Sequence, residues 1–144
     1  MTAALDDRTV AYVVTAQPIF EDLRQVASQI AGLLVLSATG SKTAAPDHPM
    51  LASASHVFAQ TADAIDRVAP SASGRATLHH DSLVHARDAL RLALAAAHAW
   101  PLDIDAVLIP LQRAYAHLRD AAGGLPGFPM VSFEQACCGV SPKL

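Results

Sequence analysis

The chain has 144 residues, a formal net charge of −3 and a charged fraction of 16%, below the usual share of about 25%. This length suits one domain with a single hydrophobic core, so residues 1–144 are interpreted as one helical-bundle domain. The acidic balance excludes a general nucleic-acid binder, because such proteins need a basic face to displace counterions from phosphates. Thirty alanines favour helices that approach closely, since alanine combines high helix propensity with a small side chain.

Neither a membrane-spanning segment nor a leader peptide is expected. The longest uncharged run, residues 25–41, contains Gln, Ser and Thr and is shorter than the roughly 20 apolar residues that span a bilayer. Asp6 and Asp7 lie near the N-terminus, where a leader would carry basic residues. We therefore expect a cytoplasmic protein that binds neither membranes nor nucleic acid.

The segment over residues 6–16 predicts a short N-terminal helix, or a helix that kinks sharply at its end. The stripe after Pro18 begins with Ile19 and Leu23, whereas the stripe before it contains Val10, Val13, Val14 and Gln17. At about 100° per residue the two stripes point in nearly opposite directions. Pro18 also removes a backbone donor at the junction, so one straight helix is not expected here.

Four longer apolar-periodic stretches predict four helices of similar length, at about residues 18–39, 49–69, 76–100 and 103–123. The breaks between them are short and rich in Pro, Gly and Ser, as antiparallel neighbouring helices require. Asp103 is a good N-cap for the last helix, and Pro110 predicts a kink inside it. We predict an all-α, up-down-up-down four-helix bundle over about residues 18–123.

Helical spacing also predicts which side chains face the core. In the second helix these are Met50, Ala54, Val57, Phe58, Thr61, Ile65 and Val68; in the third, Leu83, Ala86, Leu90, Ala93, Leu94 and Ala97; in the fourth, Ile104, Val107, Leu108, Leu111, Tyr115, Leu118 and Ala122. The pair His79 and His80 is interpreted as polar residues at the start of the third helix, together with Asp81.

Residues 124–144 predict an extended C-terminal tail laid over the bundle, because Pro126, Pro129 and Pro142 interrupt regular structure. Within the tail, residues 132–135 form a capping-box pattern that leads into Cys137 and Cys138. Adjacent thiols are candidates for a redox switch or a soft-metal site, although packing of at least one thiol against the bundle is the favoured interpretation.

The third and fourth helices share a His-Xaa-Xaa-Asp pattern. His85 and Asp88 lie three residues apart on one helix face, His117 and Asp120 repeat the spacing, and Asp81 precedes His85 by four residues. Such pairs are candidate metal ligands at a subunit interface. The favoured interpretation, however, is a solvated helix face with local His–Asp and Arg–Asp pairs.

The low charge fraction predicts that a second copy covers part of the surface. The stripe of Val26, Ile30 and Leu34 supplies the inward face of the first long helix and leaves Val35 and Leu36 pointing away, beside Gly32. Leaving two such side chains in water forgoes roughly 1.5–3 kcal/mol for each. We therefore expect a homodimer whose contact includes this segment. The alternative cover is the C-terminal tail of the same chain, with Phe128 and Phe133.

The sequence contains no complete catalytic set, so the favoured function is a non-enzymatic interaction, scaffold or small-ligand-binding protein with a small molecule or a protein as its ligand. The alternative is a metal-binding or redox-responsive bundle that uses the His/Asp pairs and the adjacent cysteines. A small hydrolase or isomerase with a Cys or His centre is a third interpretation. No cofactor is identified by the sequence.

Overall fold

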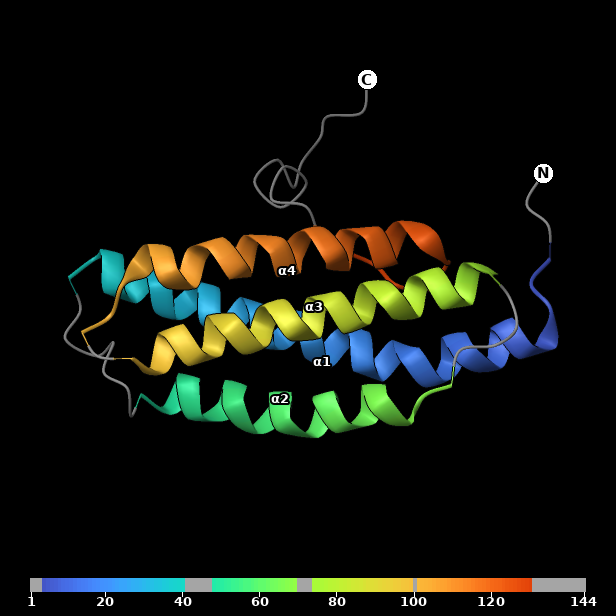
Figure 1. Cartoon of the computed structure of the whole chain (residues 1–144), viewed down its shortest axis with the longest axis horizontal. Helices are drawn as coiled ribbons and strands as arrows, with labels where there is room; N and C mark the ends of the chain where they lie inside the picture. Colours follow the sequence, from blue (N-terminus) through green and yellow to red (C-terminus); the bar gives the residue numbers. More distant parts are fainter. Residues whose placement is uncertain (1–3, 41–47, 70–73, 100, 131–144) are drawn as a thin grey trace, which may run out of the picture.

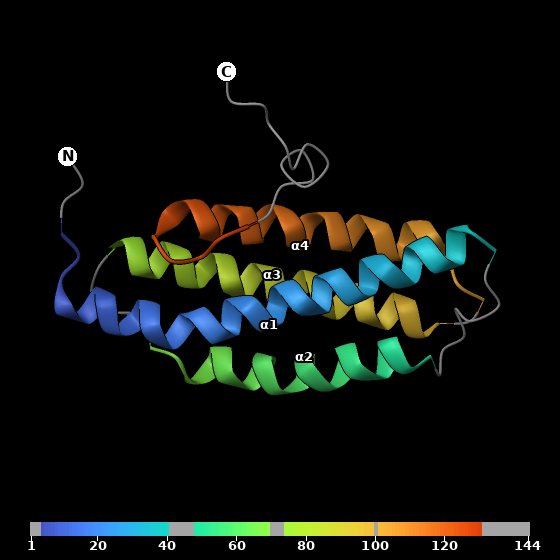
Figure 2. The same cartoon turned by 180° about the vertical axis from the view of Figure 1, so that it is seen from behind.

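The computed structural model describes residues 4–40, 48–69, 74–99 and 101–130, and these residues form an all-α fold of four helices (Figure 1). The helices are α1 (Asp7–Ala38), α2 (Pro49–Arg67), α3 (Gly74–His98) and α4 (Ile104–Gly124). Successive helices run in opposite directions, and the view from behind shows the same order (Figure 2). The predicted up-down-up-down four-helix bundle is confirmed.

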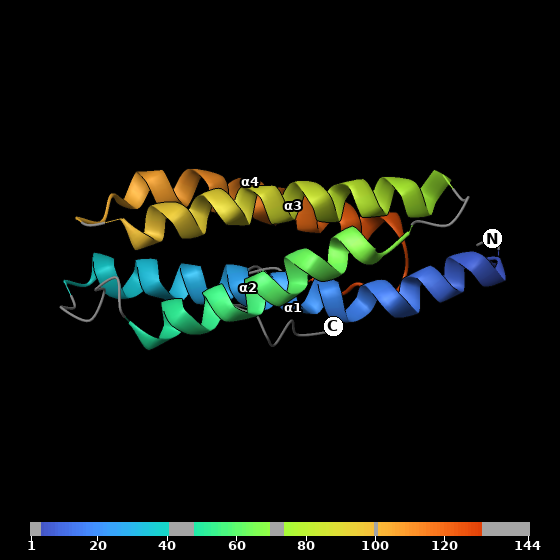
Figure 3. The same ribbon diagram turned by 60° about the horizontal axis from the view of Figure 1, so that its bottom comes forward.

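The helices are packed unequally around the core. The contact between α3 and α4 is the most extensive, α1 contacts all three other helices, and no contact joins α2 to α4 in the described part of the chain. Seen from below, α3 and α4 run side by side, whereas α2 crosses α1 at an angle (Figure 3). The bundle therefore has one closely packed side and one looser side.

The predicted separate N-terminal helix is wrong, because α1 is one helix of 32 residues with Pro18 inside it. Thr9, Tyr12 and Ala16 are buried and continue the stripe that Ile19 begins, at regular helical spacing. The exposed positions are Val10 and Val14, which sequence reading had placed on the inner face. Of the predicted stripe, Val13 is buried, and Thr9, Tyr12 and Ala16 occupy the other core positions in place of Val10 and Val14.

The helix starts follow ordinary capping chemistry. The Asp6 carboxylate accepts a hydrogen bond from the Thr9 backbone N–H at 2.7 Å, which satisfies one of the free donors of the first turn. The Asp103 carboxylate accepts from the backbone N–H groups of Asp105 and Ala106, so the predicted cap of α4 is confirmed. Helix α2 begins at Pro49.

The core positions predicted for α3 are all buried, whereas those of α2 and α4 need correction. In α2 the buried residue of the first turn is Leu51, and Met50 is half-buried. In α4 Ile104 is exposed, because it is the first residue of the helix and lies beyond the end of the apolar stripe. The buried residues that sequence reading omitted are Pro110, Ala114 and Ala121.

The tail is described as far as Met130, and this part packs on the bundle. Leu125 and Phe128 are buried, and the Gln17 side-chain amide donates to the Gly127 carbonyl oxygen at 3.1 Å. Gly127 has a φ of +94°, and a Cβ there would lie 2.7 Å from Gln17 Nε2. Glycine therefore fits both the turn and the close approach to α1. The remaining predicted tail, including its capping box, lies outside the described residues.

Candidate functional site

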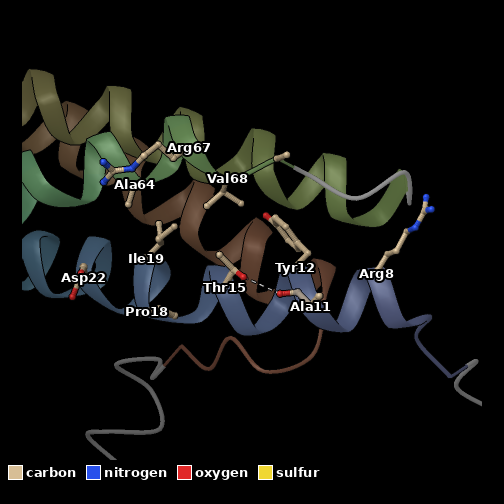
Figure 4. Close-up of a pocket in the computed structure, with 11 residues that line it drawn as sticks. Arg8, Ala11, Tyr12, Thr15, Pro18, Ile19, Asp22, Ala64, Arg67 and Val68 are labelled. Atoms are coloured by element: carbon tan, nitrogen blue, oxygen red, sulfur yellow. Dashed lines mark hydrogen bonds between the residues drawn. The ribbon is translucent and has the colours of Figure 1, made fainter.

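A groove of about 800 Å³ lies between the N-terminal half of α1 and the C-terminal end of α2 (Figure 4). Helix α1 is 13 residues longer than α2 (32 against 19), and α2 crosses it, so the two helices do not close on each other here. The lining residues come from both helices and from the chain just after α2: Arg8, Ala11, Tyr12, Thr15, Pro18, Ile19, Asp22, Ala64, Arg67, Val68 and Ala69.

The walls of the groove are mainly apolar, with small residues where the two helices face each other. Ala11 and Pro18 from α1 and Ala64 from α2 leave room that longer side chains would fill. The Thr15 hydroxyl donates to the Ala11 carbonyl oxygen at 3.0 Å, as Figure 4 shows, so this hydroxyl group is bound to its own helix. Pro18 has no backbone N–H to give to the preceding turn. An apolar body of moderate size fits such walls.

Tyr12 connects the groove to a buried histidine of α3. Its side chain lines the groove, and its hydroxyl group shares a hydrogen bond of 2.7 Å with Nδ1 of His79, whose ring is edge-on to it. Both residues are buried, with exposed fractions of 4% and 1%. Phe128 of the tail packs on the other side of His79, with the ring centroids 4.1 Å apart. The pair is therefore a polar contact enclosed by aromatic rings.

Burial sets the protonation state of this pair. It lowers the pKa of His79 to about 4, with a smaller contribution from His80, so the imidazole is neutral near pH 7. Burial also raises the pKa of Tyr12, assisted by the negative charge of Asp81, so the phenol keeps its proton. Two neutral groups thus share one hydrogen bond next to the groove.

The neutral imidazole can be protonated at either nitrogen, and the choice decides what Tyr12 offers to the groove. If Nδ1 carries the proton, it donates to the phenol oxygen, and the phenol O–H is free to donate elsewhere. If Nε2 carries it, the phenol donates to Nδ1 and a buried N–H is left over. His79 Nε2 has no hydrogen-bond partner within the described ranges, and an orphaned buried donor is costly. Each arrangement leaves one N–H or O–H group without a partner in the described part of the chain, so the Tyr12 hydroxyl group can serve the groove as a donor in one tautomer and as an acceptor in the other.

Charged side chains stand at both ends of the groove. Arg8 and Arg67 are exposed and form no ion pair with any residue that the structure describes. In Figure 4 their guanidinium groups lie at opposite ends of the site. The Asp22 carboxylate accepts a hydrogen bond from the Thr61 hydroxyl at 3.2 Å and ties α1 to α2 where the groove ends.

The predicted metal ligands meet only in part. The rings of His85 and His117 lie side by side across the α3–α4 contact, with centroids 5.1 Å apart and planes inclined by 36°. Asp88 instead accepts from Arg87 at 3.1 Å and from Arg91 at 3.2 Å. Within the described ranges no group of three or more His, Cys, Asp or Glu side chains is placed to hold a metal ion.

The other predicted ligands, Asp81 and Asp120, are exposed on α3 and α4. The candidate redox residues Cys137 and Cys138 lie outside the described residues. The structure therefore brings together two of the five residues predicted to bind metal, and the prediction stays open.

Sequence reading missed the buried hydrogen-bonded pair of Tyr12 and His79. A signal was present for His79, because it falls between Ala76 and Leu83 on the inner stripe of α3 at spacings of three and four residues. The adjacent His80 and Asp81 suggested a polar helix start, so the position of His79 on the inner face of α3 was not recognised. For Tyr12 the exposed side chains of Val10 and Val14 gave the stronger but incorrect apolar signal.

No protein-family model, curated protein sequence or solved structure matches this chain. None of the described helices combines the length and the apolar character needed to cross a membrane.

Proposed function

We propose that this protein is a non-enzymatic small-ligand-binding bundle and that the groove between α1 and α2 is its binding site. The observation that carries the proposal is the groove of about 800 Å³ with the buried Tyr12–His79 hydrogen bond at its wall. Ligand sites typically have this volume and combine apolar walls with a few polar groups that fix orientation. A buried polar pair is costly to maintain, so its position beside a groove supports a role in recognition.

The chemistry of the lining defines the class of ligand. Ile19, Val68 and the small side chains around them suit an apolar body, while the Tyr12 hydroxyl group suits one hydrogen-bonding group on it. The unpaired guanidinium groups of Arg8 and Arg67 at the ends favour a ligand with an anionic group there. We therefore propose an amphipathic small molecule with an apolar body and a terminal anionic group.

The test uses 8-anilinonaphthalene-1-sulfonate, a fluorescent probe with an apolar body and one negative charge. Wild type should bind it, and Ala64→Phe, which adds a ring inside the groove, should weaken binding by at least about tenfold, or about 1.4 kcal/mol. The matched control is Ala59→Phe, because Ala59 is an exposed alanine on the same helix and does not line the groove. Equal probe affinity in both variants, or no binding to wild type, would contradict the proposal.

The second candidate function, a metal-binding bundle, is favoured by one observation, the contact between the His85 and His117 rings. Two imidazoles from different helices are a common beginning of a transition-metal site. A redox role for Cys137 and Cys138 is retained as part of this alternative.

We also propose that the protein is a homodimer. Val35 is 62% exposed in the single chain, so a second copy could cover it. Leu36 is already half-buried within one chain. Gly32 does not leave space for a second backbone, because a Cβ there would lie 3.3 Å from Met50 Sδ of α2. Support for the expected α1 contact is therefore reduced to Val35, and the larger exposed apolar side chains of α3 and α4 are the better candidates.

A further inference from the structure

The His85–His117 pair has a geometry that suits a shared metal ion. Two imidazoles on one tetrahedral Zn²⁺, with Zn–N bonds of about 2.1 Å, have ring centroids about 5 Å apart. The observed separation is 5.1 Å. His85 is exposed and His117 is half-buried, so an ion can reach both rings from the outer face of α3 and α4. These helices form the closest contact in the bundle, which holds the pair in place.

Two ligands leave a tetrahedral ion half coordinated, and the acidic side chain three residues after His85 is already paired. Asp88 is neutralised by Arg87 and Arg91. A structural zinc site takes four protein ligands. In the described part of the chain no third His, Cys, Asp or Glu joins the pair, so the missing ligands must come from elsewhere.

Two exposed leucines of α3 flank His85 and could contact the same residues of a second copy. Leu78 and Leu92 lie seven residues before and seven residues after His85, which places the three on one side of α3. Both leucines are exposed, by 69% and 60%. A twofold axis that crosses α3 at His85 sets Leu78 against Leu92 of the second copy and Leu92 against its Leu78. Such a self-complementary patch is what an isologous dimer interface requires.

The same twofold axis also brings opposite charges on the two α4 helices together. Arg113 lies four residues before His117 and Asp120 lies three residues after it, so antiparallel α4 helices centred on His117 bring Arg113 beside Asp120 of the second copy. Both side chains are exposed and form no ion pair in the described part of the chain. The twofold axis creates this opposite-charge pair twice, which sets the register.

We propose that two copies of this chain associate through the outer faces of α3 and α4 and bind one Zn²⁺ between them. The four ligands are His85 and His117 of each copy. The site is incomplete in one chain and complete in the dimer, so zinc acts as the link between the subunits. The groove between α1 and α2 lies on other helices, and this site is independent of it.

The first experiment measures molar mass by size-exclusion chromatography with light scattering, and zinc stoichiometry by titration calorimetry. The protein carries no affinity tag and contains Cys137→Ser and Cys138→Ser, which removes competing thiols. Zinc should double the mass at one ion per two chains, and EDTA should reverse the change. His117→Ala should abolish both effects, whereas His56→Ala, a control at an exposed histidine of α2, should keep them. Unchanged mass, or one zinc per chain, would overturn the proposal.

The second experiment tests the register by charge reversal. Arg113→Asp should weaken zinc-dependent dimerisation by at least about tenfold, because it places two acids together twice. Adding Asp120→Arg to the same chain should restore it, since the pair then forms in the opposite sense. Leu36→Glu, in the α1 segment, should leave this dimer intact. The interface is wrong if Leu36→Glu alone separates the subunits or if the double charge reversal fails to recover them. Circular dichroism confirms that each variant is folded.

Discussion

The two sides of this bundle differ in how closely their helices approach. Helices α3 and α4 form the tightest pair, and their buried positions include Ala86, Ala93, Ala114 and Ala121. Helices α1 and α2 cross and leave a groove of about 800 Å³. Small side chains at successive core positions allow two backbones to close, so α3 and α4 pack along their length. On the other side the small residues line an open space that the helices do not close.

The two sides also differ in their polar chemistry. The groove side contains the Tyr12–His79 hydrogen bond, shielded by Phe128, whereas the outer face of α3 and α4 carries its histidines and charges at the surface. Burial therefore changes the pKa of His79, and it is the histidine for which a lowered pKa is resolved in the described residues. The first side suits enclosure of a ligand, and the second suits contact with another chain.

The largest expected effect is on stability, and it separates core residues from outer-face residues of α3 and α4. Leu90→Ala and Leu111→Ala should each lower the free energy of unfolding by about 2–5 kcal/mol, because both leucines are buried. His85→Ala should cost far less, since His85 is exposed. Urea unfolding of metal-free protein gives these values. A larger loss for His85→Ala than for either leucine would contradict the assignment of the two faces.

The sequence was sufficient for the fold because the α3 stripe, the proline at the start of α2 and the Asp103 cap are local signals. It failed in part at α1, where Thr9, Tyr12 and Ala16 join Val13 in the core and the exposed positions include Val10 and Val14. Whether a polar residue can be buried depends on a partner distant in sequence. Tyr12 finds His79, 67 residues away, and no local pattern shows that contact.

The candidate site was predictable only where it follows helical spacing. The echo of His85 in His117 suggested a pair on adjacent helices, and the structure places their rings in contact. The groove could not be predicted, because it depends on the crossing of α2 over α1 and on their unequal lengths. Neither property is visible in the apolar periodicity of one helix.

The second prediction is that the free energy of unfolding depends on pH through His79, on the groove side of the bundle. The pKa of His79 is about 4 in the folded protein and near 6.5 when the chain is unfolded. Between these values the unfolded state binds more protons, so the free energy of unfolding should fall as the pH drops from 6.5 to 4. A difference of this size corresponds to about 3 kcal/mol. The contribution is fully present above pH 6.5.

The control for the pH dependence is the double variant Tyr12→Phe with His79→Phe, which removes the titrating group together with its partner. The exposed histidines remain in both proteins, so their contributions cancel in the comparison. The urea concentration at the unfolding midpoint should fall more steeply for wild type than for the double variant as the pH is lowered from 7 to 4. Parallel curves would show that His79 is not buried as a neutral group.

The smallest expected effect compares the same substitution on the two sides. Ala114→Leu adds three carbons to a position with an exposed fraction of 0%, so the neighbouring helices must move, and the free energy of unfolding should fall by about 1–3 kcal/mol. Ala64→Leu adds the same atoms beside the groove, where there is space for them, and should change stability by less than about 0.5 kcal/mol. Both alanines lie inside helices, so differences in helix propensity cancel. Thermal unfolding of the two variants measures the contrast directly. If Ala64→Leu proved as destabilising as Ala114→Leu, the groove would be closed in solution and the two sides of the bundle would be packed alike.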